Sequence, residues 1–181
     1  MATSIPLIGV TGSTGQLGGR VATRLAALGQ PQRLLVRSLA RAPQLPGAEI
    51  VQASYEDGTS MRAALSGVQA LFLVSGYGPT RLEQHYSAID AAIAAGVERI
   101  VYTSFLAAAP LATFTHAREH NLTEQRISAT GSRYTFLRPT FYLDRGLHVG
   151  SPMRGLSRDL LATALSPGSL ATIWLTWPSL F

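Results

Sequence analysis

The sequence contains neither cysteine nor lysine, and both absences restrict the chemistry that the chain can perform. Without cysteine, disulfide bonds, thiolate metal sites and cysteine nucleophiles are excluded, and a reducing compartment is compatible with the composition. All 15 basic residues are arginine, so Schiff-base chemistry and every mechanism that needs a catalytic lysine are excluded as well. We expect no metal site.

Long hydrophobic runs and clustered charge are also missing. The N-terminal apolar run is too short to span a bilayer, and no basic segment precedes it, so we expect a soluble, cytoplasmic protein without a membrane partner. The formal net charge of +5 comes from scattered arginines, and residues 1–144 carry 12 arginines against 9 acids. A solvated surface explains this charge better than nucleic-acid binding does.

Three glycines near the N-terminus form the clearest motif of the sequence. Residues 5–10 can form a buried strand, and Gly12, Gly15 and Gly18 separate this run from a helical pattern. A strand, a glycine turn and a helix in this order make an anion site, because backbone N–H groups and the positive helix end face the anion. The motif therefore predicts dinucleotide binding.

Apolar runs and helical patterns alternate along the chain with short connections. The expected strands are residues 5–10, 33–37, 48–53, 69–75, 98–103 and 133–138, with helices between most of them. One helical stripe consists of Leu82, Tyr86, Ile89 and Ile93, and we expect this stripe to face the core. The alternation predicts an α/β fold with a doubly wound parallel sheet, the NAD(P)-binding Rossmann fold.

The residue after the second strand bears on the choice of cofactor. An acid at this place would hydrogen-bond the ribose 2′-hydroxyl of NAD, whereas an arginine accommodates the 2′-phosphate of NADP. Arg37 stands there, and Ser38 and Arg41 follow without an acid nearby. We therefore favour NADP(H) over NAD(H); the alternative is an ordinary surface arginine.

With these residues in place, residues 3–144 resemble the NmrA-like, atypical short-chain dehydrogenase/reductase family. The resemblance is strongest to its branch of NAD(P)H-dependent quinone and triphenylmethane-dye reductases. The matching segments are 11–18 (TGSTGQLG), 36–37 (VR), 101–104 (VYTS), 120–124 (HNLTE) and 134–142 (YTFLRPTFY). The fourth segment corresponds to the H-x-x-T-E pattern of that branch.

The resemblance implies a set of cofactor-binding residues. Around the pyrophosphate it implies Gly12, Ser13, Thr14, Gly15, Gln16, Leu17 and Gly18. It puts Arg37 near the adenosine 2′ position, and it puts Ser75 with Gly76, and Thr103 with Ser104, near the nicotinamide ribose. The pair at 53–54 (AS) departs from the Gly-Asp or Ala-Asp that is common at the end of the third strand, which weakens the expected adenine contact.

The implied activity is hydride transfer from NAD(P)H to a quinone-like or other conjugated small-molecule acceptor. Typical short-chain dehydrogenases use a Tyr-x-x-x-Lys pair, which this sequence cannot form. Because the cofactor carries the hydride, the protein mainly has to hold an acceptor ring over the nicotinamide. His120 is the candidate proton donor. The equal alternative is a helix histidine that orients a loop, and we assign no role to His85, His116 or His148.

Two other functions are alternatives to the reductase. A non-catalytic NmrA-like, NAD(P)-binding redox sensor is kept open by the missing Tyr-x-x-x-Lys pair, whereas the H-x-x-T-E segment favours the reductase. An epimerase is disfavoured, since it too usually relies on the Tyr–Lys pair. The sequence leaves a homodimer open.

Residues 145–181 show neither the family pattern nor a regular periodicity. We therefore expect a Rossmann domain over 1–144, an irregular tail over 145–181 and no C-terminal substrate lobe, so that a chain of this sequence is weakly active or inactive. In a shifted reading frame, residues 158–164 can encode GPAGDG and residues 169–178 can encode ARDDMADVA, both of which fit the family. We hypothesise a frameshift near residue 145; the alternative is a divergent C-terminus, and the DNA downstream of codon 144 decides between them.

Overall fold

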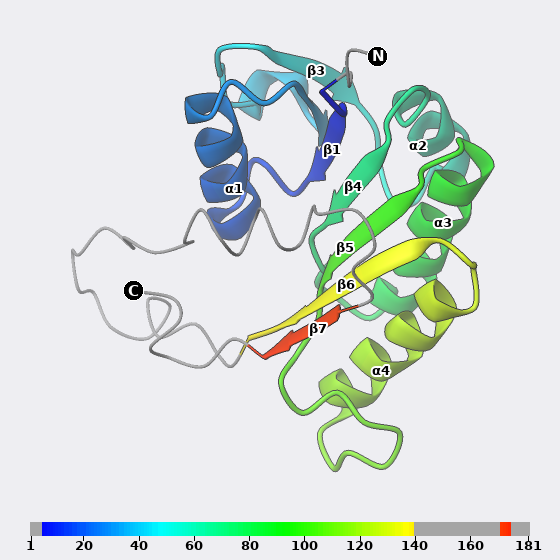
Figure 1. Ribbon diagram of the computed structural model, residues 1–181. Helices are drawn as coiled ribbons and strands as arrows, with labels where there is room; N and C mark the ends of the chain where they lie inside the picture. Colours follow the sequence, from blue (N-terminus) through cyan, green and yellow to red (C-terminus); the bar gives the residue numbers. More distant parts are fainter. Residues whose placement is uncertain (1–4, 140–170, 175–181) are drawn as a thin grey trace.

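The computed structural model describes residues 5–139 and 171–174, and its centre is one parallel sheet. The strands lie in the order β3-β2-β1-β4-β5-β6-β7, and every neighbouring pair is parallel (Figure 1). Their bounds are Ile8–Thr11 (β1), Gln32–Val36 (β2), Ala48–Gln52 (β3), Ala70–Leu73 (β4), Arg99–Thr103 (β5), Arg133–Arg138 (β6) and Ala171–Trp174 (β7). The predicted α/β fold with a doubly wound parallel sheet is confirmed.

Helices cover both faces of the sheet. They are α1 (Gln16–Ala27), α2 (Gly58–Ala64), α3 (Arg81–Ala94) and α4 (Thr115–Ser128), with a 3₁₀ turn η1 at Leu39–Arg41. Helix α1 lies on one side, and α2, α3 and α4 lie on the other (Figure 1). Two separate apolar clusters follow from this arrangement, one around Val10, Leu25 and Phe72 and one around Leu71, Ile89 and Ile100.

The central strands are apolar along their whole length because they are covered on both faces. Every residue of β1, β4 and β5 is buried, which explains the nearly continuous hydrophobic runs in the sequence. Chain order reverses between β1 and β4: β2 and β3 lie on one side of this pair, and β5 and β6 lie on the other. In such sheets, ligands bind at the carboxyl ends of the strands, next to this reversal point.

The face that α3 buries agrees with the predicted one only in part. Of the expected stripe of Leu82, Tyr86, Ile89 and Ile93, Ile89 is fully buried and Ile93 is half-buried against the core, whereas Leu82 and Tyr86 are half-buried outside the core cluster. The buried residues of α3 are Arg81, His85, Ala88, Ile89, Ala91 and Ala92. The hydrophobic stripe alone does not identify the buried face, because Arg81 and His85 are buried as well. Both side chains bond to partners on α4.

The tail contains one described element. Ala171–Trp174 forms β7 and pairs in parallel with β6 from Thr135↔Ala171 to Arg138↔Trp174, where the sequence predicted no regular structure. The rest of segment 145–181 lies outside the described residues, so the domain boundary after residue 144 and the frameshift stay predictions. Within residues 5–139 and 171–174, no helix has both the length and the apolar character needed to cross a membrane.

Candidate functional site

The glycine turn between β1 and α1 needs glycine at two positions for different reasons. Gly12 has a φ of 64°, a left-handed conformation that side chains disfavour, and its carbonyl accepts a hydrogen bond from the Gly15 N–H at 2.9 Å. A Cβ on Gly18 would lie 2.5 Å from the Gly12 carbonyl carbon and 2.7 Å from the Thr11 oxygen. The start of α1 therefore packs directly against the backbone that leaves β1.

The first turn of α1 has the properties of an anion site. Its N-cap is Gly15, which has no side chain to cap the helix, and no acidic residue occupies the first turn. The Ser13 hydroxyl is buried, and it has no hydrogen-bond partner among the residues that the structure describes. Free N–H groups, the positive end of the dipole and an unused hydroxyl together fit a dinucleotide pyrophosphate.

Other predicted loop residues form the rim of this turn. Thr14, Gly15 and Gln16 are exposed, and Leu17 is half-buried. The structure thus brings the whole predicted pyrophosphate set, Gly12 to Gly18, to the carboxyl end of β1. Its role in binding stays a prediction.

Arg37 lies beside this turn. It follows β2, which pairs with β1 in the register Thr11↔Leu35, so it stands two residues beyond the partner of Thr11. Its side chain is exposed, and its backbone carbonyl accepts a hydrogen bond from the Gln52 side chain at 3.1 Å. Arg37 is thus exposed beside the glycine turn, and its contact with a phosphate on the adenosine ribose stays a prediction.

Tyr55 connects the ends of β1 and β4, a role that the sequence gave no reason to assign. Its hydroxyl lies 2.6 Å from the Thr11 hydroxyl and 2.8 Å from the Val74 carbonyl, and burial raises the pKa of this phenol far above its usual value. The tyrosine comes from the loop after β3. It therefore ties together three segments at the point where strand order reverses.

The segment after β4 is held through three consecutive backbone amides. The Val74 N–H donates to the Thr11 hydroxyl at 2.9 Å, and the Ser75 N–H donates to the Thr103 hydroxyl at 2.7 Å. The Gly76 N–H donates to Nε2 of His85 at 2.8 Å. Side chains from β1, β5 and α3 thus fix residues 74–76, which include the predicted nicotinamide-side pair Ser75 and Gly76.

Ser104 hydrogen-bonds a side chain on α4 that also binds β6. Its hydroxyl donates to Glu124 at 2.6 Å, and Nε of Arg138 donates to the same carboxylate oxygen at 2.8 Å. The second carboxylate oxygen pairs with the Arg138 guanidinium, and this bond raises the pKa of Arg138. The E of the H-x-x-T-E segment therefore joins the carboxyl ends of β5 and β6.

His120 is buried behind β5 rather than exposed to solvent. Its Nδ1 lies 2.8 Å from the hydroxyl of Tyr102, and its ring stacks on Phe105. Burial, followed by the nearby Arg81 guanidinium, lowers the pKa of His120 from 6.5 to about 3, so the ring is neutral at pH 7. A neutral ring favours the orienting alternative over an imidazolium proton donor, and the catalytic role stays a prediction.

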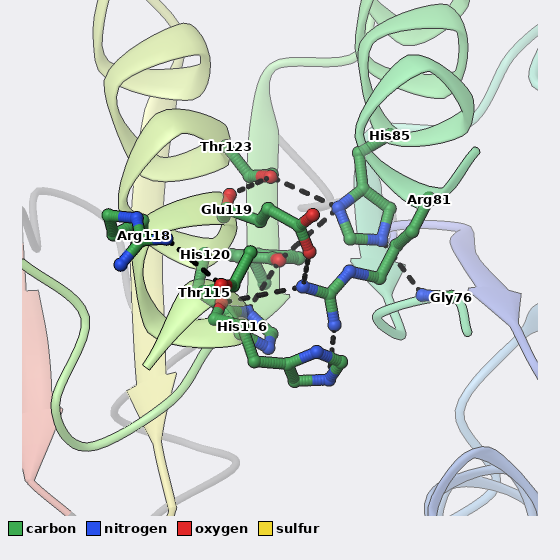
Figure 2. Close-up of polar contacts among 10 residues, drawn as sticks. Gly76, Arg81, His85, Thr115, His116, Arg118, Glu119, His120 and Thr123 are labelled. Carbon is green, nitrogen blue, oxygen red and sulfur yellow. Dashed lines mark hydrogen bonds and ion pairs between the residues drawn. The ribbon is translucent and has the colours of Figure 1, made fainter. Parts of the chain in front are cut away.

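Arg81 and His85 form the buried polar group of α3 (Figure 2). The Arg81 guanidinium pairs with the Glu119 carboxylate and hydrogen-bonds His116. Nδ1 of His85 lies 3.0 Å from the Thr123 hydroxyl, which donates to the Glu119 carbonyl at 2.9 Å. Sequence reasoning assigned no role to His85 or His116, although the i, i+4 spacing of Arg81 and His85 on one helix was a visible signal.

Metal binding has no support in the part of the chain that the structure describes. No group of three or more histidine, aspartate or glutamate side chains there could hold a metal ion. The polar cluster around His85 and His120 is instead connected by hydrogen bonds and by the ion pair between Arg81 and Glu119.

Known proteins resemble the chain in sequence and in structure. Residues 12–171 match the NAD(P)H-binding family, further along the chain than the expected end of the resemblance at residue 144. Quinone oxidoreductase 2 of Escherichia coli is 35% identical over 173 residues, 92% of this chain and 59% of that protein. An NAD(P)H azoreductase of Xenophilus azovorans is 29% identical over 82% of this chain and 52% of that protein.

Solved structures show the same likeness. The NADPH complex of an NADPH-dependent quinone oxidoreductase of Escherichia coli has a TM-score of 0.75 at 32% identity, covering 95% of this chain and 70% of that one. The NADP(H) complex of a triphenylmethane reductase of Citrobacter sp. has a TM-score of 0.71 at 35% identity, covering 77% and 51%. The chain spans 59% and 61% of the length of the first two curated relatives.

Proposed function

Because the chain belongs to the NAD(P)H-binding family, in its NmrA-like quinone-reductase branch, we propose that it reduces a quinone-like or other conjugated acceptor with NADPH. The observation that carries this proposal is the start of α1 at the strand reversal point: an uncapped helix end, the close approach at Gly18 and the unused buried hydroxyl of Ser13. These features fit a pyrophosphate. When bound, the cofactor supplies the hydride.

The position of Arg37 determines the orientation that we propose for the bound dinucleotide. Arg37, beside β2, takes the adenosine 2′-phosphate, while Gly12 to Gly18 take the pyrophosphate. Ser75, Gly76 and Thr103, which lie across the reversal point at β4 and β5, would then hold the nicotinamide half. The protein would bind and orient the cofactor, with the hydrogen-bonded backbone of residues 74–76 contributing to the nicotinamide end of the site.

Relatives support the class of acceptor. Their names specify a quinone, an azo compound and a triphenylmethane compound, which are all conjugated acceptors. Reduction of such acceptors needs a hydride donor held at short distance more than it needs an activated tyrosine, which agrees with the absence of lysine. A conjugated small molecule is therefore the acceptor class that we propose for this chain.

A non-catalytic NAD(P)-binding sensor is the second candidate, and two observations favour it. The chain has no lysine for a Tyr-x-x-x-Lys pair, and the pKa of His120 is too low for this histidine to be protonated at pH 7. A sensor would keep the cofactor site and lack turnover.

The deciding experiment combines binding with turnover on the purified chain. NADPH fluorescence is titrated first, and NADPH oxidation is then followed with a benzoquinone, an azo dye and a triphenylmethane dye. Binding with oxidation of at least one acceptor supports the reductase. Binding without oxidation is expected both of a sensor and of a reductase without its substrate lobe, and the same assay with the reading frame restored downstream of codon 144 separates these two: oxidation then supports the reductase, and its continued absence supports the sensor. No NADPH binding contradicts both functions.

Replacing Arg37 by serine is expected to weaken NADPH binding by about tenfold or more, because a charge-assisted bond to the 2′-phosphate is lost. NADH has no such phosphate, so its dissociation constant is expected to stay the same. Titrations of both cofactors check this, with Arg62→Ser, an exposed arginine on α2, as the matched control. Equal losses for NADPH and NADH would remove Arg37 from the cofactor site.

A further inference from the structure

His85 lies directly behind the segment that follows β4, although no sequence motif assigned it a role. Its Nε2 accepts the Gly76 N–H at 2.8 Å, and its Nδ1 lies 3.0 Å from the Thr123 hydroxyl (Figure 2). A backbone N–H can only donate, so Nε2 is the acceptor, and in a neutral ring Nδ1 carries the proton towards Thr123. The ring thus connects α4 to the Gly76 backbone.

The surroundings keep this ring neutral and in one orientation. His85 is buried, and it packs edge-on against Tyr102 and Tyr55. Burial, followed by the charges of Arg81 and His116, lowers the pKa of His85 to about 3. Nε2 is therefore an acceptor throughout the neutral pH range, and protonation does not interrupt its bond to Gly76.

The hydrogen bond between the Gly76 N–H and His85 is relevant to the cofactor because of where it lies. Gly76 is the last of three amides, after Val74 and Ser75, that side chains hold at the carboxyl end of β4. The other two acceptors, Thr11 and Thr103, are hydroxyls on strands of the sheet, whereas His85 reaches the chain from a helix. Without the imidazole, the Gly76 amide would lose its acceptor just where the nicotinamide half of the cofactor is proposed to lie.

We propose that His85 is a positioning residue, held by Thr123, that fixes the Gly76 backbone for the nicotinamide half of NADPH. This inference rests on the proposed function for its ligand and goes beyond it in naming the residue that sets the loop. His85 touches neither hydride donor nor acceptor. It acts through the backbone of Gly76.

Two nearly isosteric variants separate this role from simple filling of space. Glutamine places its terminal oxygen near the position of Nε2, and asparagine places its amide N–H group near the position of Nδ1, where it can donate to the Thr123 hydroxyl. His85→Gln therefore retains an acceptor for Gly76, whereas His85→Asn retains only the contact with Thr123. The asparagine variant is expected to raise the NADPH dissociation constant about tenfold, the typical effect of an unpaired buried donor, and the glutamine variant is expected to stay near wild type.

Adenosine 2′,5′-bisphosphate provides the matched ligand control, because it ends at the first phosphate and does not reach Gly76. Both variants are expected to bind it like the wild type. Equal NADPH affinity of the asparagine and glutamine variants would overturn the proposal, as would a parallel loss for the bisphosphate. Failure of the wild type to bind NADPH would instead refute the proposed function.

Amide hydrogen exchange at Gly76 tests the structural step without any cofactor. Exchange is expected to be about tenfold faster in His85→Asn than in His85→Gln, because only the latter keeps the N–H bonded. Identical exchange rates in the two variants would overturn the positioning role, whatever the cofactor result.

Discussion

Gly18→Ala is expected to raise the NADPH dissociation constant by about 100-fold or more, since displacements near 1 Å in a binding site have effects of this size. The added methyl group would lie 2.5 Å from the Gly12 carbonyl carbon and 2.7 Å from the Thr11 oxygen, and closer still to the Gly12 oxygen. All three are backbone atoms of β1 and its turn, so no side chain can move aside. The helix and the turn have to separate, which opens the proposed pyrophosphate site.

Helix propensity alone predicts the opposite result for this substitution, a gain of about 1 kcal/mol in stability for alanine over glycine. Gly58→Ala is the control that isolates this effect, because its Cβ approaches nothing closer than the Ser87 hydroxyl at 3.4 Å. Gly58 opens α2, away from the glycine turn. Fluorescence titration and thermal unfolding of both variants check the prediction, and NADPH affinity within about threefold of wild type in Gly18→Ala would contradict it.

The fold was predictable because its signals are local in the sequence. Each buried strand needs only an apolar run, and the turn at Gly12 needs only glycine at fixed spacing. The strand expected at 69–75 nevertheless ends at Leu73, because Val74 and Ser75 bond to side chains on other strands rather than to a neighbouring backbone. The end of β4 at Leu73 thus depends on Thr11 and Thr103, and no local sequence pattern connects these residues to residue 74.

The candidate site was predictable only in part, for the same reason. Its sequence neighbours suggest that Arg81 is a charged surface residue. Its side chain is nevertheless only 1% exposed, because it forms an ion pair with Glu119, 38 residues away. Burial of His85 likewise depends on its contact with Thr123, and burial of Tyr55 depends on its hydrogen bond with Thr11. Each of these partners lies on a different element, so burial of the polar side chain becomes visible only when the sheet is assembled.

Acidification is expected to destabilise the chain strongly between pH 7 and pH 5. His85 and His120 both have a pKa lowered from 6.5 to about 3 in the folded chain, mainly by burial. In the unfolded chain both bind protons below pH 6.5, whereas in the folded chain they stay neutral. The unfolded state therefore binds more protons, and stability is complete above pH 6.5 and falls as the pH drops towards 3.

Each additional proton of the unfolded state lowers the free energy of unfolding by about 1.4 kcal/mol per pH unit, so two histidines remove about 4 kcal/mol between pH 7 and pH 5. His85 contributes to the shift of His120, and the two titrate as a pair rather than singly. The loss is a large part of the roughly 5–15 kcal/mol that stabilises an ordinary domain. Urea unfolding at pH 7, 6 and 5, at constant ionic strength, measures it.

The double variant His85→Gln/His120→Asn decides whether these two rings cause the loss. Glutamine keeps the acceptor for Gly76, and asparagine keeps a polar atom near the Tyr102 hydroxyl, but neither side chain titrates. The pH dependence is then expected to become shallow, since His116 alone keeps a lowered pKa among the described histidines. An unchanged slope in the double variant would mean that the two rings take up protons equally in the folded and the unfolded chain, so that folding does not lower their pKa. In that case Nε2 of His85 would lose its lone pair to a proton as the pH falls through 6.5, and the Gly76 N–H would lose its acceptor in that range.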